Sequence, residues 1–527
     1  MIKYFASSIL ILFLSNEIKA QTTVNWADDI ACIVYTHCGR CHNNENSLAA
    51  FPLISYQQMF GQRTAMMIYT QNMSMPPYLP ITKHTRFAEE KNLTTEEIAL
   101  IKDWVNSGAV QGDSTHAPTP PVFNISAGIL TSPDVSVKIP TYVVPNTAVN
   151  FRQVFVLTPP LSSSKNIEAI EIAPGNPSAV YSVYVYADTS STPLQLDNAD
   201  AALGYTHFGG IGSNSAKPIF GWVPGSEPFY FPQGFGLHID SGSRYIVQVE
   251  YAEDAGGKTD STLLNIRYGS PSVREFRSLP LLSHNINLIN GPLFIKADSV
   301  VSFEEIYNVT SDITLLSISP MLHNICKGFH VYSVSALNDT TDIIEIGNWN
   351  TVWSQGVYVF QYPLHIMSGS TLHAIAHFDN RFSNLNNPNN PLQNINAGVN
   401  ENNEEMIFYF ETTPYQIGDE LIVMDTAPHM NHYLNCSPLH SPVNINEIII
   451  HESLVSIYPN PTNNIVNINA NEINSITIYN TLGEIIFSEN KINTNELQIN
   501  TSQWSKGIYS IQVNTKVKLI NKKLIVN

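Results

Sequence analysis

The sequence predicts a mainly β protein of several domains, with one small α-helical domain near its N-terminus. Its 527 residues are too many for one hydrophobic core, because domains usually hold roughly 100 to 200 residues. Hydrophobic residues make up 43% and charged residues 13%, which favours folded domains over disordered tails or coiled coils. The abundant Gly, Pro, Tyr and Phe residues (27, 32, 24 and 23) favour strands joined by turns.

The charge balance excludes one large class of partners. The formal net charge is -18, and no run of basic residues interrupts the acidic sequence. Nucleic-acid binding is therefore not expected, because phosphate contacts need basic patches.

Residues 1–20 have the pattern of a secretory signal. Lys3 precedes an apolar run over residues 9–14, and Ala20 supplies the small residue at the cut. The run is far shorter than the roughly 20 residues that span a bilayer, and no other stretch is long and apolar enough to do so. We expect an exported protein without a transmembrane segment.

Residues 24–113 form the expected helical domain. Trp26, Ile30 and Val34 recur at helical spacing, and Thr94 with Glu97 predicts a capping box before an amphipathic helix that contains Trp104. The Pro-rich segment 112–121 predicts a stiff linker and hence a domain boundary.

The strongest motif of the chain is Cys38-Gly39-Arg40-Cys41-His42, a CxxCH sequence in this helical domain. Its two thiols can add to the vinyl groups of a haem while the adjacent imidazole reaches the iron. The alternatives are a disulfide or half of a zinc site, but no second cysteine pair lies nearby. The motif predicts covalently attached haem c.

The second axial ligand is expected in the stretch 73–77, where Met75 precedes two prolines. Met73 is expected to be a core residue, and His37 and His84 are the alternative ligands. The order of this Met-Pro-Pro loop, Arg86-Phe87, the Asn92-Leu93-Thr94 cap and the Trp104 helix resembles small cytochrome c domains, which implies that the whole segment is one haem domain.

Short alternating segments separated by Gly, Pro and Asn clusters fill residues 122–426 and predict strands. About 300 residues suit two antiparallel β-sandwiches in tandem, which we place at 122–280 and 281–426. Alternation resumes at 454–527 and predicts one more small β-sandwich.

Several segments of residues 122–426 are similar, in the same order, to the copper type II, ascorbate-dependent monooxygenases, which include peptidylglycine and dopamine hydroxylases. In the first half they are Ile170–Asn176, Gly221–Gly225 and Tyr245–Tyr251, and in the second half Ser319–His323, Asp379–Asn380 and Glu404–Met406. The resemblance implies two β-sandwiches that each bind one copper, with three histidines in the first and two histidines and a methionine in the second.

Most of the implied ligands are replaced in this chain. Tyr181, Ser182 and Glu250 stand at the three histidine positions of the first site, which we therefore expect to be empty. At the second site Met321 replaces the first histidine, while His323 and Met406 remain. One imidazole and two thioethers can hold Cu(I) but bind Cu(II) poorly, so copper is a possible cofactor only.

Other histidines and the cysteines leave alternatives open. His330, His365, His373 and His377, or the pair His429 and His432, could supply substitute ligands. Among the five cysteines, Cys326 and Cys436 could form a disulfide, which would leave Cys32 as a small buried residue.

The C-terminal region resembles the sorting domain of type IX secretion cargo. The segments that carry the resemblance are Tyr458–Pro461, Ile478–Gly483 and Gly507–Tyr509. It implies the type IX secretion machinery as a partner and a secreted or cell-surface location. An ordinary adhesive β-sandwich is the alternative.

Together these observations predict an exported electron-transfer protein with haem c and a monooxygenase-like sandwich pair, whose electron donor or acceptor and substrate are not specified. One alternative is an active monooxygenase in which the haem feeds a single copper on Met321, His323 and Met406, since the usual relay between two coppers would be lost. A further alternative is a surface binding module.

Overall fold

The fold is described from a computed structural model of the chain. It describes residues 24–44, 49, 51–78, 80–81, 85–88, 90–120, 128–146, 151–207, 210–351, 354, 356–400, 402–424, 455–480, 484–515 and 519–526. These residues belong to two compact units, one within residues 1–439 and one within 440–527. The predicted signal at residues 1–20 lies outside the described residues.

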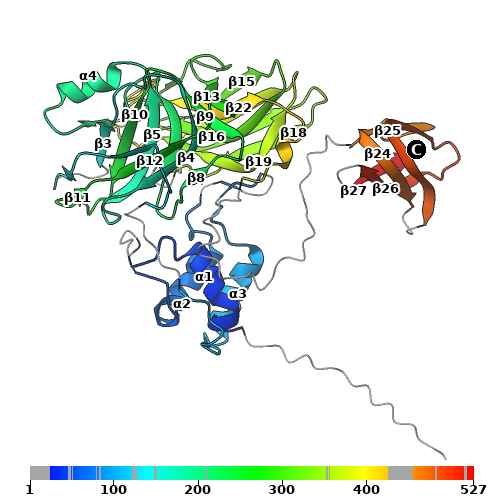
Figure 1. Cartoon of the computed structure of the whole chain (residues 1–527), viewed down its shortest axis with the longest axis horizontal. Helices are drawn as coiled ribbons and strands as arrows, with labels where there is room; N and C mark the ends of the chain where they lie inside the picture. The colour runs from blue at the N-terminus through cyan, green and yellow to red at the C-terminus, as the bar shows by residue number, and fades with distance from the viewer. Residues whose placement is uncertain are drawn as a thin grey trace, which may run out of the picture. The chain divides into compact units, whose positions relative to one another are not determined.

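Four helical segments build the N-terminal helical domain, whose α-helices group together in Figure 1 (blue). They are η1 (Trp26–Ile30), α1 (Ala31–His37), α2 (Tyr56–Gln71) and α3 (Thr95–Asn106). Their apolar faces share one core, in which Trp26 and Trp104 pack with ring centroids 6.1 Å apart. The predicted capping box is confirmed, because the Thr94 hydroxyl accepts from the Glu97 amide and the Glu97 carboxylate accepts from the Thr94 amide.

Two β-sandwiches follow the helical domain, so the prediction of a mainly β fold is confirmed. The first packs a five-stranded sheet against one half of a nine-stranded sheet. The five strands, in spatial order, are β6 (Tyr205–Thr206), β3 (Phe151–Val156), β10 (Arg244–Tyr251), β5 (Val180–Asp188) and β7 (Lys217–Trp222). The facing half consists of β1 (Val135–Lys138), β12 (Leu263–Tyr268), β4 (Lys165–Ala173), β9 (Phe235–Ile239) and β8 (Phe229–Tyr230), the last paired with β4. Strands β2 (Tyr142–Val143) and β11 (Thr259–Asp260) and helix α4 (Thr192–Ala199) complete this part.

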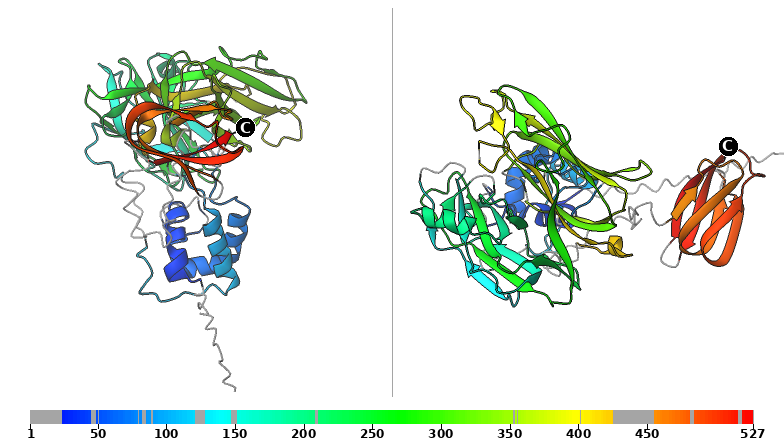
Figure 2. Two further views of the ribbon diagram at one scale, coloured as in Figure 1. Left: turned by 90° about the vertical axis from the view of Figure 1, so that its right-hand side faces the viewer. Right: turned by 90° about the horizontal axis from the view of Figure 1, so that it is seen from above.

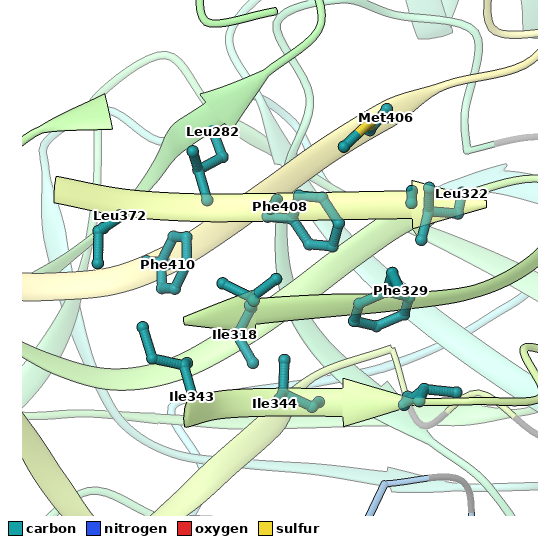
Figure 3. Packing of buried hydrophobic residues seen from close by; sticks show 14 of the residues in the cluster. Leu282, Ile318, Leu322, Phe329, Ile343, Ile344, Leu372, Met406, Phe408 and Phe410 are labelled. Atoms are coloured by element: carbon teal, nitrogen blue, oxygen red, sulfur yellow. The ribbon is translucent and has the colours of Figure 1, made fainter. Parts of the chain in front are cut away.

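The second sandwich packs a four-stranded sheet against the other half of the nine-stranded sheet. The four strands are β15 (Val300–Asn308), β20 (Thr371–Asp379), β17 (Cys326–Val334) and β18 (Thr340–Ile346). The facing strands are β22 (Met406–Pro414), β16 (Ile313–Leu322) and β19 (Tyr358–Ile366). Figure 3 shows the core between them, where Phe408 packs against Phe329 with ring centroids 5.2 Å apart and Ile318 and Phe410 belong to the same cluster. Strands β14 (Phe294–Ile295) and β21 (Ile395–Asn396) and helix η2 (Asp419–Leu421) lie outside these sheets.

One strand belongs to both sandwiches. Strand β13 (Arg274–Ser283) pairs in parallel with β9 of the first sandwich and antiparallel with β22 of the second. The boundary that we placed at residue 280 falls inside this strand. The nine-stranded sheet therefore runs without a break from one sandwich to the next.

A segment of the helical domain is inserted between the two layers of the second sandwich. We call residues 85–88 the edge strap. The Ala88 amide donates to the Val359 carbonyl, and the Gln361 amide donates to the Arg86 carbonyl, so the strap pairs with edge strand β19. On the other side the Thr85 hydroxyl donates to the Asp342 carbonyl of edge strand β18. Phe87 is 2% exposed and packs on Tyr358 and Phe360, so it belongs to the core of this sandwich.

The C-terminal unit is a five-stranded antiparallel domain, seen in orange to red in Figure 2. Its strands are β23 (Val455–Tyr458), β24 (Ile465–Tyr479), β25 (Ile485–Asn500), β26 (Gly507–Thr515) and β27 (Leu519–Val526). The Pro-Asn-Pro sequence after β23 connects to the last strand of the unit. The Asn460 side chain donates to the Lys523 carbonyl and accepts from the Ile525 amide of β27.

The burial of Phe87 gives a first prediction. Phe87→Ala should lower the free energy of unfolding by about 3–5 kcal/mol, because it leaves a cavity in an aromatic core. Denaturant unfolding followed by fluorescence measures this change. Phe382→Ala is the matched control, since Phe382 is 78% exposed and its removal should cost less than about 0.5 kcal/mol. Equal effects of the two variants would contradict the insertion of the strap.

Glu305 gives a second prediction. Its side chain is fully buried, and neither carboxylate oxygen has a hydrogen-bond partner among the described residues. Burial raises the pKa of Glu305 to about 9, so the folded protein holds a proton that the unfolded chain releases near pH 4.3. Stability should fall by about 1.4 kcal/mol for each pH unit between these two values.

Glu305→Gln should remove this decline of stability with pH, as seen in unfolding curves recorded from pH 5 to pH 9. Glu304→Gln is the control, because Glu304 is partly exposed on the opposite face of β15 and its loss should leave the decline in place. A wild-type stability that is flat over this pH range would contradict a protonated Glu305.

Candidate haem-attachment site and the copper-site positions

The CxxCH motif continues the end of helix α1. The Cys38 amide donates to the Val34 carbonyl, and the amides of Cys41 and His42 both donate to the Cys38 carbonyl. Both sulfurs and the imidazole are thus presented from one tight turn. Cys38 and Cys41 are free thiols, and Cys38 packs against the core of the helical domain. Burial, the neighbouring Cys41 and Glu97 raise the pKa of Cys38 to about 12, and burial also raises the pKa of Cys41, so both are protonated at neutral pH.

His42 is oriented by a backbone contact. Its Nδ1 lies 2.9 Å from the Phe51 carbonyl oxygen, and the Phe51 ring packs beside the imidazole. Burial lowers the pKa of His42, which favours the neutral ring. A neutral ring that donates from Nδ1 keeps the lone pair on Nε2 for a metal. This donor set, two thiols and one oriented imidazole, fits a covalently attached haem.

The candidate axial methionines follow helix α2. The Met75 amide donates to the Tyr69 carbonyl, and the Met75 side chain is 39% exposed. Met73 is 79% exposed and has a positive φ of 58°, so the prediction that it is a core residue is wrong. Of the alternative ligands, His37 pairs with Glu97 of α3 at 3.2 Å, and His84 lies outside the described residues.

At the first copper position one of the replacing residues, Glu250, forms a buried ion pair with Arg152. The Ser182 hydroxyl donates to Glu250 at 3.0 Å, and Nη2 of Arg152 lies 3.2 Å from the same carboxylate oxygen. Strands β5, β10 and β3 bring these three side chains together by their register. The side chains of Arg152 and Glu250 are 8% and 4% exposed. The Arg152 guanidinium therefore supplies a positive charge beside the Glu250 carboxylate. The sequence could not predict this pair, because the two residues are brought together only by the pairing of strands β3 and β10.

The three predicted ligands of the second copper position do not share one face. Leu322 pairs directly with Met406, and both side chains lie in the core of the second sandwich (Figure 3). Because side chains alternate along a strand, Met321 points to the other face, where it packs against an apolar cluster of the first sandwich. The residue that faces His323 is Glu405, with 3.6 Å between Nε2 and the nearer carboxylate oxygen.

The surroundings of His323 are polar and buried. His323 is 4% exposed, its Nδ1 lies 3.0 Å from the Asn403 carbonyl, and its amide donates to Glu404. Burial opposes a charged imidazole, but Glu405 and Glu404 outweigh it and raise the pKa of His323. Burial raises the pKa of Glu404 to about 7. In the part of the chain that the structure describes, no three His, Cys, Asp or Glu side chains are grouped as metal ligands.

The remaining predicted histidines have other partners. His330, His365 and His373 pair with Asp342, Asp312 and Glu304, and His377 contacts the Ser302 hydroxyl. His429 and His432 lie outside the described residues.

The cysteine prediction needs correction. Cys326 is a free, fully buried thiol, so it forms no disulfide, and Cys32 is disulfide-bonded rather than a spare buried residue. Cys436 lies outside the described residues. Sequence could not show this, because a disulfide depends on the distance between two chain segments that are far apart in sequence.

The helical domain also contacts the first sandwich through the motif itself. The Cys41 thiol donates to the Pro224 carbonyl at 3.1 Å, and Arg40 pairs with Glu227 at 3.6 Å. A small pocket lies beside this contact, and it is lined by side chains that include Ala88 of the strap, Glu227, Val359 and Glu411. Sequence reasoning missed Arg40 and Glu227, since neither is part of the CxxCH signature.

Comparison with known proteins identifies the C-terminal unit. Residues 456–527 match the family described as a secretion system C-terminal sorting domain. The prediction of a type IX sorting tail, and with it export to the cell surface or the medium, is confirmed. In the described part of the chain, no helix has the length and apolar character needed to cross a membrane.

No curated protein sequence matches this chain, and several solved structures are similar to it at low sequence identity. The adhesin domain of Epf from Streptococcus pyogenes is 11% identical, with 43% of this chain and 72% of that chain covered and a TM-score of 0.13. The CBM51-2 and INT domains of Clostridium perfringens ZmpB are 10% identical, with 50% and 86% covered and a TM-score of 0.14. A biofilm-associated protein BSP domain is 6% identical, with 77% and 84% covered and a TM-score of 0.15.

The ion pair at the first copper position gives a third prediction. Glu250→Ala removes the carboxylate that faces the buried Arg152 guanidinium and should destabilise the protein by about 3–5 kcal/mol in denaturant unfolding. Replacing both partners, Arg152→Met with Glu250→Leu, should recover most of this loss. Asp254→Ala, which breaks the pair that the 78% exposed Asp254 makes with Lys258, should cost less than about 1 kcal/mol. If Glu250→Ala lowered the free energy of unfolding by no more than this control, the prediction that the buried Arg152–Glu250 pair stabilises the fold would be wrong.

Proposed function

We propose that this protein is an exported electron-transfer protein that carries one covalently attached haem c in its N-terminal helical domain. The observation that carries the proposal is the arrangement of Cys38, Cys41 and His42. Two free thiols lie in one turn, and an imidazole that is fixed through Nδ1 follows directly.

Each residue has a defined role in this proposal. Cys38 and Cys41 would hold the haem through two thioether bonds, each made by adding one S–H across one vinyl group, with the sulfur on one vinyl carbon and the hydrogen on the other. His42, whose ring is oriented by the Phe51 carbonyl, would bind the haem iron through Nε2. Met75 would supply a thioether as a second protein ligand to the iron, which would raise the reduction potential. When bound, the haem supplies one-electron chemistry at its iron.

The sandwich pair acts in this proposal as a scaffold and not as a hydroxylase. A reaction that relays electrons between two coppers would need imidazole donors in the first sandwich, where Arg152 and Ser182 both contact Glu250. Copper binding at the second position can be measured directly. Metal analysis after copper loading should give less than about a tenth of an equivalent, and His323→Ala should not change it.

The proposal is tested by the haem content of the full chain, produced together with a haem-attachment system. The purified wild type should carry one haem that stays bound after denaturation and shows reduced-minus-oxidised haem bands. Cys38→Ala with Cys41→Ala should abolish this haem, whereas Cys326→Ala, which removes the other free thiol of the described chain, should retain it. A wild-type protein without haem bands would overturn the proposal.

Met75 gives a fourth prediction. Met75→Ala should lower the midpoint potential of the haem in a spectroscopic redox titration, because a thioether ligand favours the reduced iron. Met73→Ala is the matched control two residues away and should leave the potential unchanged. If the two variants behaved alike, Met75 would not be the axial ligand.

A further inference from the structure

The loop between strands β7 and β8 lies against the CxxCH motif. We call residues 223–227 the docking turn. It is closed by two internal hydrogen bonds, from the Ser226 amide to the Val223 carbonyl and from the Val223 amide to the Ser226 hydroxyl. Although the turn belongs to the first sandwich, its outer side meets the helical domain.

Backbone groups of the docking turn make the closest contacts. The Pro224 carbonyl accepts a hydrogen bond from the Cys41 thiol at 3.1 Å and another from Lys91 Nζ at 3.2 Å. Both donors come from the helical domain, one from the motif and one from the segment before α3. A single carbonyl therefore ties two parts of that domain to the first sandwich.

Gly225 allows this close approach. Its φ is +85°, a backbone conformation that residues other than glycine rarely adopt. A Cβ atom there would lie 3.0 Å from Cβ of Arg40 and 3.1 Å from Sγ of Cys41. The close approach of Gly225 to Cys41 does not depend on the thiol proton, so the same contact can form when the Cys41 sulfur is bonded to a haem.

The docking turn also places a charge beside the motif. Glu227 pairs with Arg40 at 3.6 Å, and the side chains are 7% and 10% exposed. Burial reduces screening by water, so each charge acts strongly on its surroundings. The two charges of this pair offset each other, so a change in either one changes the net charge beside the motif.

We propose that the docking turn is part of the haem site, and that the Arg40–Glu227 pair is a positioning pair that sets the reduction potential by balancing charge beside the motif. This inference rests on the proposed function, because it assumes that Cys38 and Cys41 carry haem. It adds that the first sandwich, and not the helical domain alone, determines the redox behaviour.

The first test is a set of charge variants in the haem-loaded full chain. Oxidised haem carries one more positive charge than reduced haem. Glu227→Gln removes a negative charge beside the motif and should therefore raise the midpoint potential, whereas Arg40→Gln removes a positive charge and should lower it. The double variant should return close to wild type, and Glu227→Asp should preserve the wild-type value.

The signs of these shifts separate an electrostatic role from a merely structural one. Opposite shifts that cancel in the double variant support the proposal. Two shifts in the same direction, or no shift in either single variant, overturn it.

The second test does not need haem. In the reduced full chain produced without a haem-attachment system, Gly225→Ala should raise the alkylation rate of Cys41 by about tenfold, because its Cβ forces the turn away from the motif. Gly234→Ala is the matched control, since Gly234 has a φ of +87° and open space around its Cβ position. Equal alkylation rates of Cys41 in the two variants would contradict the claim that the docking turn covers Cys41.

The two tests also distinguish the failure of each claim. If no haem attaches under any condition, the proposed function fails, while the alkylation test still decides whether the turn covers Cys41. If haem attaches but the charge variants do not shift the potential in opposite directions, the proposed function survives and the role of the Arg40–Glu227 pair is overturned.

Discussion

The insertion of Phe87 between the two layers of the second sandwich is the contact on which the arrangement of the first unit depends. A sandwich that ends in strands β18 and β19 leaves two open edges, each with unpaired backbone groups. The edge strap pairs with β19 through two amides and contacts β18 through Thr85, while the Phe87 ring fills the space between them. The helical domain is thus held by the second sandwich through backbone and core contacts, and not only by its linker.

The same constraint orients the CxxCH motif. The helical domain is held at the strap by the second sandwich and at Cys41 and Lys91 by the first, and the two sandwiches share strand β13. Three chain segments that are distant in sequence therefore limit one another's position. A haem attached at this motif would be carried by a rigid support, which suits electron transfer because that process needs a fixed approach to its partner and little movement of the protein.

The sequence predicted features that depend on neighbouring residues. The capping box of Thr94 and Glu97, the turn of the CxxCH motif and the mainly β fold all follow from local patterns. The predictions that went wrong depend on long-range contacts. Cys326 is buried and unpaired, Cys32 is the bonded cysteine, and the strap enters a domain that begins almost 200 residues later.

The copper positions show that even a one-residue error in strand alignment changes which side chains are predicted to meet. The sequence placed Met406 beside His323, but a change of one residue along a strand moves a side chain to the other face of the sheet. Glu405 is the side chain that meets His323, while Met406 joins the core. Similarly, Glu250 was expected only as a lost ligand, and its partner Arg152 became visible only through the pairing of β3 with β10.

Hydrogen exchange of the intact chain tests the central contact most directly. The amides of Ala88 and Gln361 donate across the junction of the strap with β19. The account predicts that both exchange as slowly as amides inside core strands such as β20, because they open only when the sandwich opens. Exchange at Ala88 as fast as in an exposed loop, with the β20 amides still protected, would show that the strap is not part of the second sandwich.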